Sequence, residues 1–90
     1  MAIKQVSSEI ILVTPEMAKQ WLSDNAHNRK INSVRVAELC KKMRDGNWKE
    51  KGPAIEVTDT GHLINGQHRL TAIILSEKSI RIRVRTYTKI

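Results

Sequence analysis

The chain has 90 residues and a basic composition, with 16 Lys and Arg against nine Asp and Glu and a formal net charge of +7. A chain of this length forms one domain, residues 1–90, near the size at which a single core is stable without disulfides or metal. Its one cysteine, Cys40, excludes an internal disulfide and a cysteine-rich metal site. The charge favours phosphate-rich partners, either nucleotides or nucleic acid. No apolar run approaches the roughly 20 residues that cross a bilayer, so we expect a cytoplasmic protein that does not bind membranes.

The N-terminal region predicts a strand followed by a helix. Residues 8–13 form an apolar, β-branched run that is too short for a helix, which predicts a short buried strand. Thr14 can cap a helix, and Pro15 suits the first helical position because its missing N–H is not needed there. We expect this helix to end near Asn25. Its apolar face consists of Met17, Ala18, Trp21 and Leu22.

A polar segment, Asn25–Asn32, follows and predicts a loop. Asn28 and Arg29 make this loop a second candidate for phosphate contact. A second helix is predicted from Ser33, and Gly46 provides its left-handed stop. Its apolar stripe has the spacing i, i+3, i+4 and i+7 and consists of Val36, Leu39, Cys40 and Met43.

Because Cys40 lies on this apolar stripe, we expect it to be a core residue and not a catalytic nucleophile. The other face of this helix is basic, and it contacts phosphate only if the neighbouring loops also do. Trp48 is expected to fold back over the core. The basic residues of that face are Arg35, Lys41, Lys42 and Arg44.

Residues 53–58 and 62–64 predict two strands, joined by a turn with Gly61 at its left-handed position. The apolar run of residues 70–75 predicts a short helix that is buried on most sides. Between strand and helix lies the sequence Asn65-Gly66-Gln67-His68-Arg69. First-turn amides of a helix lack intrahelical partners and attract anions, so this turn is a candidate phosphate site. The alternative is an ordinary turn with surface polar residues.

The last strand alternates between apolar and arginine residues. Ile80, Ile82 and Val84 fall on one side, and Arg81, Arg83 and Arg85 fall on the other. The arginines repeat at about 6.6 to 7 Å, close to the spacing of successive phosphates in a nucleic-acid strand. The alternative is an edge strand protected from aggregation by its charges. The chain has only three aromatic residues, so stacking on bases is not expected.

The order of these elements, together with two motifs, resembles the ParB/sulfiredoxin-like superfamily, and in particular the small ParB-like proteins of phages and mobile elements. The motifs are Asn65–Leu70 with Ala72, and Gly46-Asn47-Trp48. The resemblance implies an α/β (α+β) domain with a small mixed sheet and three short helices. It also implies that Gly66, Gln67, His68 and Arg69 hold the phosphates of a nucleotide, ATP or CTP, in a bacterial or phage-infected cell.

The chain departs from two branches of that family. Sulfiredoxins have a cysteine where this chain has Gln67, so sulfinic-acid reduction is not expected. Chromosome-partition proteins have an arginine where this chain has His68, and they carry a separate helix-turn-helix domain. Specific operator recognition and a CTP-driven clamp are therefore not expected.

Three functions follow as alternatives. The first is a module that binds nucleotide, DNA or RNA phosphates through residues 66–69 and the loop residues Asn28 and Arg29. Nucleic-acid backbone contacts are assigned to Arg81, Arg83, Arg85, Arg35 and Lys42. We favour this function because binding requires only what the sequence displays.

The second alternative is a ParB-like nuclease or nucleotide hydrolase. His68 would be its general base, and Arg69 would stabilise charge on phosphorus. Such chemistry commonly uses Mg²⁺ held by carboxylates, but near the turn only Asp59 and Glu56 are available and they do not form a recognisable pair, so no metal ligand is assigned. The third alternative is a small phage-type protein that binds and inhibits a host protein. The sequence leaves the oligomeric state open, a homodimer included.

Overall fold

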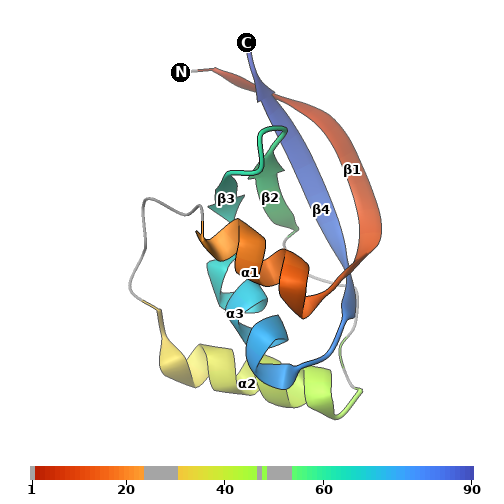
Figure 1. Cartoon of the computed structure of the whole chain (residues 1–90), viewed down its shortest axis with the longest axis vertical. Helices are drawn as coiled ribbons and strands as arrows, with labels where there is room; N and C mark the ends of the chain where they lie inside the picture. The colour runs from red at the N-terminus through yellow and green to blue at the C-terminus, as the bar shows by residue number, and fades with distance from the viewer. Residues whose placement is uncertain (1, 24–30, 47, 49–53) are drawn as a thin grey trace.

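The computed structural model describes residues 2–23, 31–46, 48 and 54–90. It has a four-stranded mixed sheet and three helices, which confirms the small α/β domain expected from the sequence (Figure 1). The elements in chain order are β1 (Ile3–Val13), α1 (Pro15–Ser23), α2 (Ser33–Arg44), β2 (Ile55–Thr58), β3 (Leu63–Asn65), α3 (Gln67–Ser76) and β4 (Ile80–Lys89).

The strands lie in the order β1-β4-β2-β3. β4 pairs antiparallel with β1 and parallel with β2, and β2 pairs antiparallel with β3. β1 and β4 form a long ribbon that brings the two ends of the chain together (Figure 1), where the Ile90 amide donates to the Ala2 carbonyl at 3.2 Å. Helices α1 and α3 pack against each other beside the sheet, and α2 packs against α3.

β1 differs from the short buried strand predicted for residues 8–13. It begins at Ile3, and among its residues only Val13 is buried. The extra length comes from pairing, because β4 runs to Lys89 and supplies partners for the whole of β1. The low burial follows from the position of β1 at the edge of the sheet.

β4 confirms the alternation read from the sequence. Ile80, Ile82 and Val84 are buried, whereas the intervening arginines are exposed or half-buried. The edge-strand interpretation of the arginines is wrong, because β4 has hydrogen-bonded neighbours on both sides. Since side chains alternate across a strand, the arginines project from the sheet face opposite the core.

The helix ends follow local sequence signals. The Thr14 hydroxyl accepts a hydrogen bond from the Met17 amide at 3.2 Å, and Gly46 follows α2 with a φ of +72°. Trp48 packs against the core as expected, and Cys40 is buried within it. Among the described residues no helix is both long and apolar enough to cross a membrane.

Helix α3 is buried or half-buried at every position except one. Leu70 and Ile73 are fully buried, but Leu75 is 53% exposed. The helix packs against α1 and α2, and these neighbours leave the side of the helix that carries Leu75 open. The prediction that α3 is buried on most sides is therefore confirmed except at Leu75, the one exposed residue of this helix.

Candidate functional site

The turn between β3 and α3 requires glycine at position 66. Gly66 has a φ of +117°, a conformation that L side chains rarely adopt. A Cβ added there would lie 3.0 Å from Cγ1 and 3.3 Å from Cα of Ile55, a fully buried residue of β2. Glycine thus lets the backbone turn tightly against the sheet and begin the helix at Gln67.

The first turn of α3 has no capping side chain. Gly66 is the N-cap residue, and its carbonyl accepts the Leu70 amide at 3.0 Å. At α2, by contrast, Asn32 Oδ1 accepts the amides of Val34 and Arg35 at 3.1 and 3.2 Å. Because a helix N-terminus carries partial positive charge, an uncapped one favours an anion.

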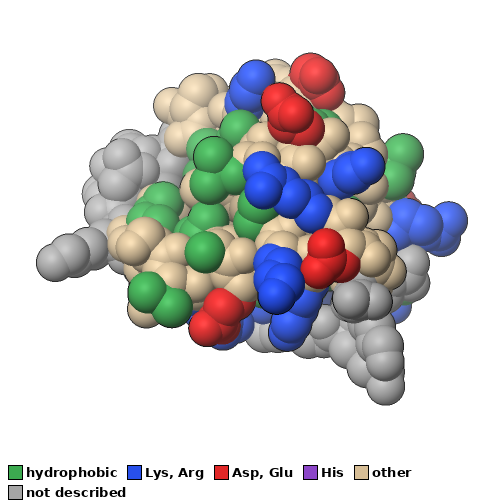
Figure 2. Space-filling model, turned by 90° about the horizontal axis from the view of Figure 1, so that it is seen from below, with side chains coloured by type: hydrophobic (Ala, Val, Ile, Leu, Met, Phe, Trp, Pro, Cys, Tyr) green, Lys and Arg blue, Asp and Glu red, His purple; other side chains and the backbone are tan. Residues whose placement is uncertain are grey.

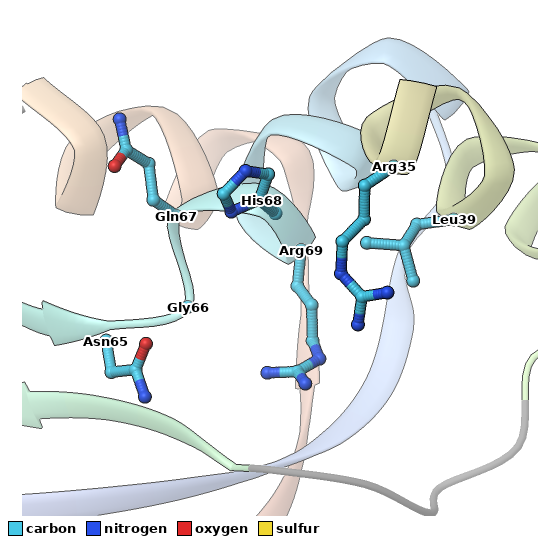
Figure 3. A pocket seen from close by; sticks show the side chains of 7 residues that line it. All are labelled: Arg35, Leu39, Asn65, Gly66, Gln67, His68 and Arg69. Atoms are coloured by element: carbon cyan, nitrogen blue, oxygen red, sulfur yellow. The ribbon is translucent and has the colours of Figure 1, made fainter. Parts of the chain in front are cut away.

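Two arginines reach this turn from different helices. Arg69 comes from the first turn of α3 and Arg35 from α2, and their guanidinium groups extend into the same space (Figure 3). The Gln67 side chain points to the opposite side of the turn. Together the residues line a pocket of about 160 Å³, formed by Arg35, Leu39, Asn65, Gly66, Gln67, His68 and Arg69.

The two guanidinium groups make the pocket electropositive. Burial, and secondly the positive charge of Arg35, lower the pKa of the Arg69 guanidinium below its ordinary value. No carboxylate of the described residues contributes an opposing effect on this pKa. Arginine keeps its proton in proteins, so the lowered pKa expresses an energetic cost of holding the charge there, and a bound anion would offset that cost.

His68 links the two helices. Its Nε2 accepts a hydrogen bond from the Asn32 amide at 3.0 Å, so the ring ties the first turn of α3 to the N-cap of α2. A neutral imidazole in this arrangement carries its proton on Nδ1. The lone pair that a general base would use is engaged in this contact.

The structure separates the other predicted contact residues from the pocket. Arg83 donates to the Ser8 hydroxyl at 3.0 Å, and neither it nor Arg81 or Arg85 lines the pocket. Lys42 is exposed on α2 and also does not line it. The predicted loop contacts Asn28 and Arg29 lie outside the described residues.

The sequence had assigned Arg35 to the nucleic-acid backbone rather than to the turn. Nothing local to residue 35 predicts its approach to Arg69, because that approach depends on the packing of α2 against α3. Asn65 was also not assigned to the site. Its position next to Gly66 in the sequence was the only available signal.

The carboxylates near the turn have other partners. The Tyr87 hydroxyl donates to Glu56 Oε2 at 2.5 Å, and Asn65 Nδ2 donates to Glu56 Oε1 at 3.4 Å. Asp59 accepts from the Thr88 hydroxyl at 2.8 Å. Within the described part of the chain, no three His, Cys, Asp or Glu side chains form a group suited to a metal ion.

Comparisons with protein-family models, curated proteins and solved structures gave no match. The resemblance to the ParB/sulfiredoxin-like superfamily therefore rests on its sequence motifs.

Proposed function

We propose that this protein is a phosphate-binding module that binds nucleotide or nucleic-acid phosphates at the pocket between α2 and α3. The observation that carries the proposal is the convergence of Arg35 and Arg69 on the uncapped start of α3, in a pocket that no carboxylate of the described part of the chain lines. Guanidinium groups bind phosphate oxygens through paired N–H donors, and helix amides add further donors. A phosphate would supply the negative charge that the site lacks.

The pocket size supports a phosphoryl group as the bound part. Small-molecule sites commonly enclose about 300 to 1,000 Å³, and this pocket has about 160 Å³. The sugar and base of a nucleotide would then lie outside it. We expect weak discrimination between bases, because phosphate contacts carry no sequence information.

The motif resemblance supports the same function. It suggests ATP or CTP as the nucleotide and a phage or mobile-element protein of the bacterial cytoplasm. The arginines of β4 would add DNA or RNA backbone contacts on the open sheet face. In this proposal the β4 arginines act separately from the pocket.

Isothermal titration of ATP, CTP and a short DNA duplex, at one fixed salt concentration, tests the proposal. Arg69→Ala and Arg35→Ala should each lose about 1.5 to 3 kcal/mol of binding free energy, the range for hydrogen bonds to charged groups. The matched control is Lys19→Ala, an exposed lysine of α1 outside the pocket. Unchanged affinity in folded Arg69→Ala, or an equal loss in Lys19→Ala, would contradict the proposal.

The geometry favours binding over hydrolysis, because the His68 lone pair already accepts from Asn32. We expect no turnover of nucleotide or DNA in the presence of Mg²⁺ or Mn²⁺. Metal-dependent turnover in a nuclease-free preparation, abolished by His68→Ala with binding retained, would establish the enzyme alternative instead.

A further inference from the structure

Helices α2 and α3 also form a groove on a side distinct from the phosphate pocket. The groove has a volume of about 600 Å³, and its apolar lining includes Ile31, Ala37, Cys40 and Leu75. None of these residues lines the phosphate pocket. The space-filling view from below shows hydrophobic side chains gathered next to lysine and arginine side chains (Figure 2).

The apolar lining is unusually accessible to water. Leu75 is 53% exposed and Ile31 is 38% exposed, while Cys40 lies deeper, at 7%. Contiguous exposed apolar surface with a polar rim is typical of a protein–protein interaction site. The groove therefore has an accessible apolar rim and a buried floor.

The shape fits a helix. Ser33 and Ala37 on α2 and Thr71 on α3 are small lining residues, so another backbone can approach closely. The 12 residues of α2 make a wall about 18 Å long at 1.5 Å per residue. An amphipathic helix of about three turns, with anchors at i, i+3, i+4 and i+7, matches that length.

The basic residues at the rim of the groove favour a partner with acidic side chains. Lys41 and Arg44 line the groove, and among the described residues that line it Asp45 is the only acidic one. Arg44 donates to the Leu75 carbonyl at 2.9 Å. This hydrogen bond holds the Arg44 guanidinium next to the apolar lining of the groove. A second copy of the chain would bring another net charge of +7 and another basic rim against this one, whereas acidic side chains would complement it.

We propose that this groove binds an acidic amphipathic helix of another protein. The helix places leucine-type side chains on Leu75, Ile31 and the floor near Cys40, and its carboxylates contact Lys41 and Arg44. This interaction is independent of the phosphate-binding pocket.

The test uses a synthetic peptide of about 14 residues with leucines at i, i+3, i+4 and i+7 and glutamates elsewhere, labelled for fluorescence anisotropy. A scrambled peptide of the same composition is its control. Leu75→Ser and Lys41→Glu should each weaken binding of the patterned peptide roughly tenfold or more. Val34→Ser should not, because Val34 is a 67% exposed residue of α2 that does not line the groove.

The reactivity of Cys40 shows whether the peptide binds in the groove, because Cys40 is the only cysteine of the chain and lines the groove. The patterned peptide should slow alkylation of its thiol, and Arg69→Ala should leave peptide binding unchanged. Equal binding of the scrambled peptide, unchanged affinity in Leu75→Ser, or an unprotected Cys40 would overturn the proposal. Concentration-dependent dimerisation in sedimentation, abolished by Leu75→Ser, would overturn it in favour of a second copy.

Discussion

The protein has two basic regions, the pocket at the start of α3 and the arginines of β4, and they differ in their partners. On β4, Arg83 donates to the hydroxyl and carbonyl oxygens of Ser8, and Arg85 lies close enough to Tyr87 to affect its pKa. In the pocket, Arg69 and Arg35 repel each other, and no carboxylate of the described residues offsets the burial of Arg69. The Arg83 guanidinium is thus hydrogen-bonded within the fold, whereas the pocket holds two guanidinium groups whose mutual repulsion a bound anion would offset.

The largest expected effect concerns the turn that creates the pocket. Gly66→Ala should lower the free energy of unfolding more than Gly61→Ala. Both glycines have positive φ, but a Cβ at Gly61 would have no heavy atom within 4 Å beyond its own residue and its chain neighbours, whereas one at Gly66 meets Ile55. The difference should be about 1 to 3 kcal/mol, the usual cost of overpacking a core. Urea denaturation measures it, and equal losses would show that the contact with Ile55 does not constrain the turn.

A second prediction is that the β4 arginines affect the binding of DNA alone, whereas the pocket arginines affect the binding of both DNA and a mononucleotide. Replacing Arg81, Arg83 and Arg85 by Gln should reduce the slope of log affinity for DNA against log salt by about 0.7 to 0.9 per lost phosphate contact. Because these arginines do not line the pocket, the affinity for a mononucleotide should stay the same. Arg35→Gln with Arg69→Gln should weaken both. If the β4 variant leaves the DNA slope unchanged, these arginines form only a solvated face.

Stability provides a third comparison. Arg83→Ala should lower the free energy of unfolding by about 0.5 to 1.5 kcal/mol, because it removes the bonds to Ser8. Arg69→Ala should not lower it, because Arg69 carries a partly desolvated charge beside Arg35. Thermal and urea unfolding of the two variants in parallel would test this. A larger loss in Arg69→Ala than in Arg83→Ala would assign Arg69 a structural role.

The smallest effect concerns Tyr87, the only tyrosine of the chain. Its hydrogen bond to Glu56, then desolvation and the charge of Glu56, raise the pKa of the Tyr87 phenol, while Arg85 opposes the rise. The folded state therefore favours the protonated phenol. This contribution to stability is fully present below the pKa of an unfolded tyrosine, about 10, and is lost as the pH rises through the folded pKa.

Titration of the tyrosinate absorbance checks this prediction. Glu56→Gln should move the transition to lower pH, since it removes the carboxylate that stabilises the protonated form. Glu38→Gln is the matched control, an exposed glutamate on α2. An unchanged transition in Glu56→Gln would show that the hydrogen bond does not hold the phenol in solution.

Local sequence determined the elements that depend on neighbouring residues. The i, i+3, i+4, i+7 stripe specified α2, the alternation specified the inner and outer faces of β4, and Gly46 and Gly61 marked positions of positive φ. Each of these features follows from backbone sterics or from a repeat within one element. They could therefore be read without knowing the fold.

Tertiary structure decided the rest. The length of β1 depends on its pairing with β4, and the central position of β4 depends on the order of strands. Arg35 reaches the turn only because α2 packs against α3, and the same packing leaves Leu75 exposed at a groove. Contacts between residues distant in sequence have no local periodicity. The sequence alone therefore indicated a candidate anion site with one arginine at the turn, and only the packing of α2 against α3 brought a second arginine to it.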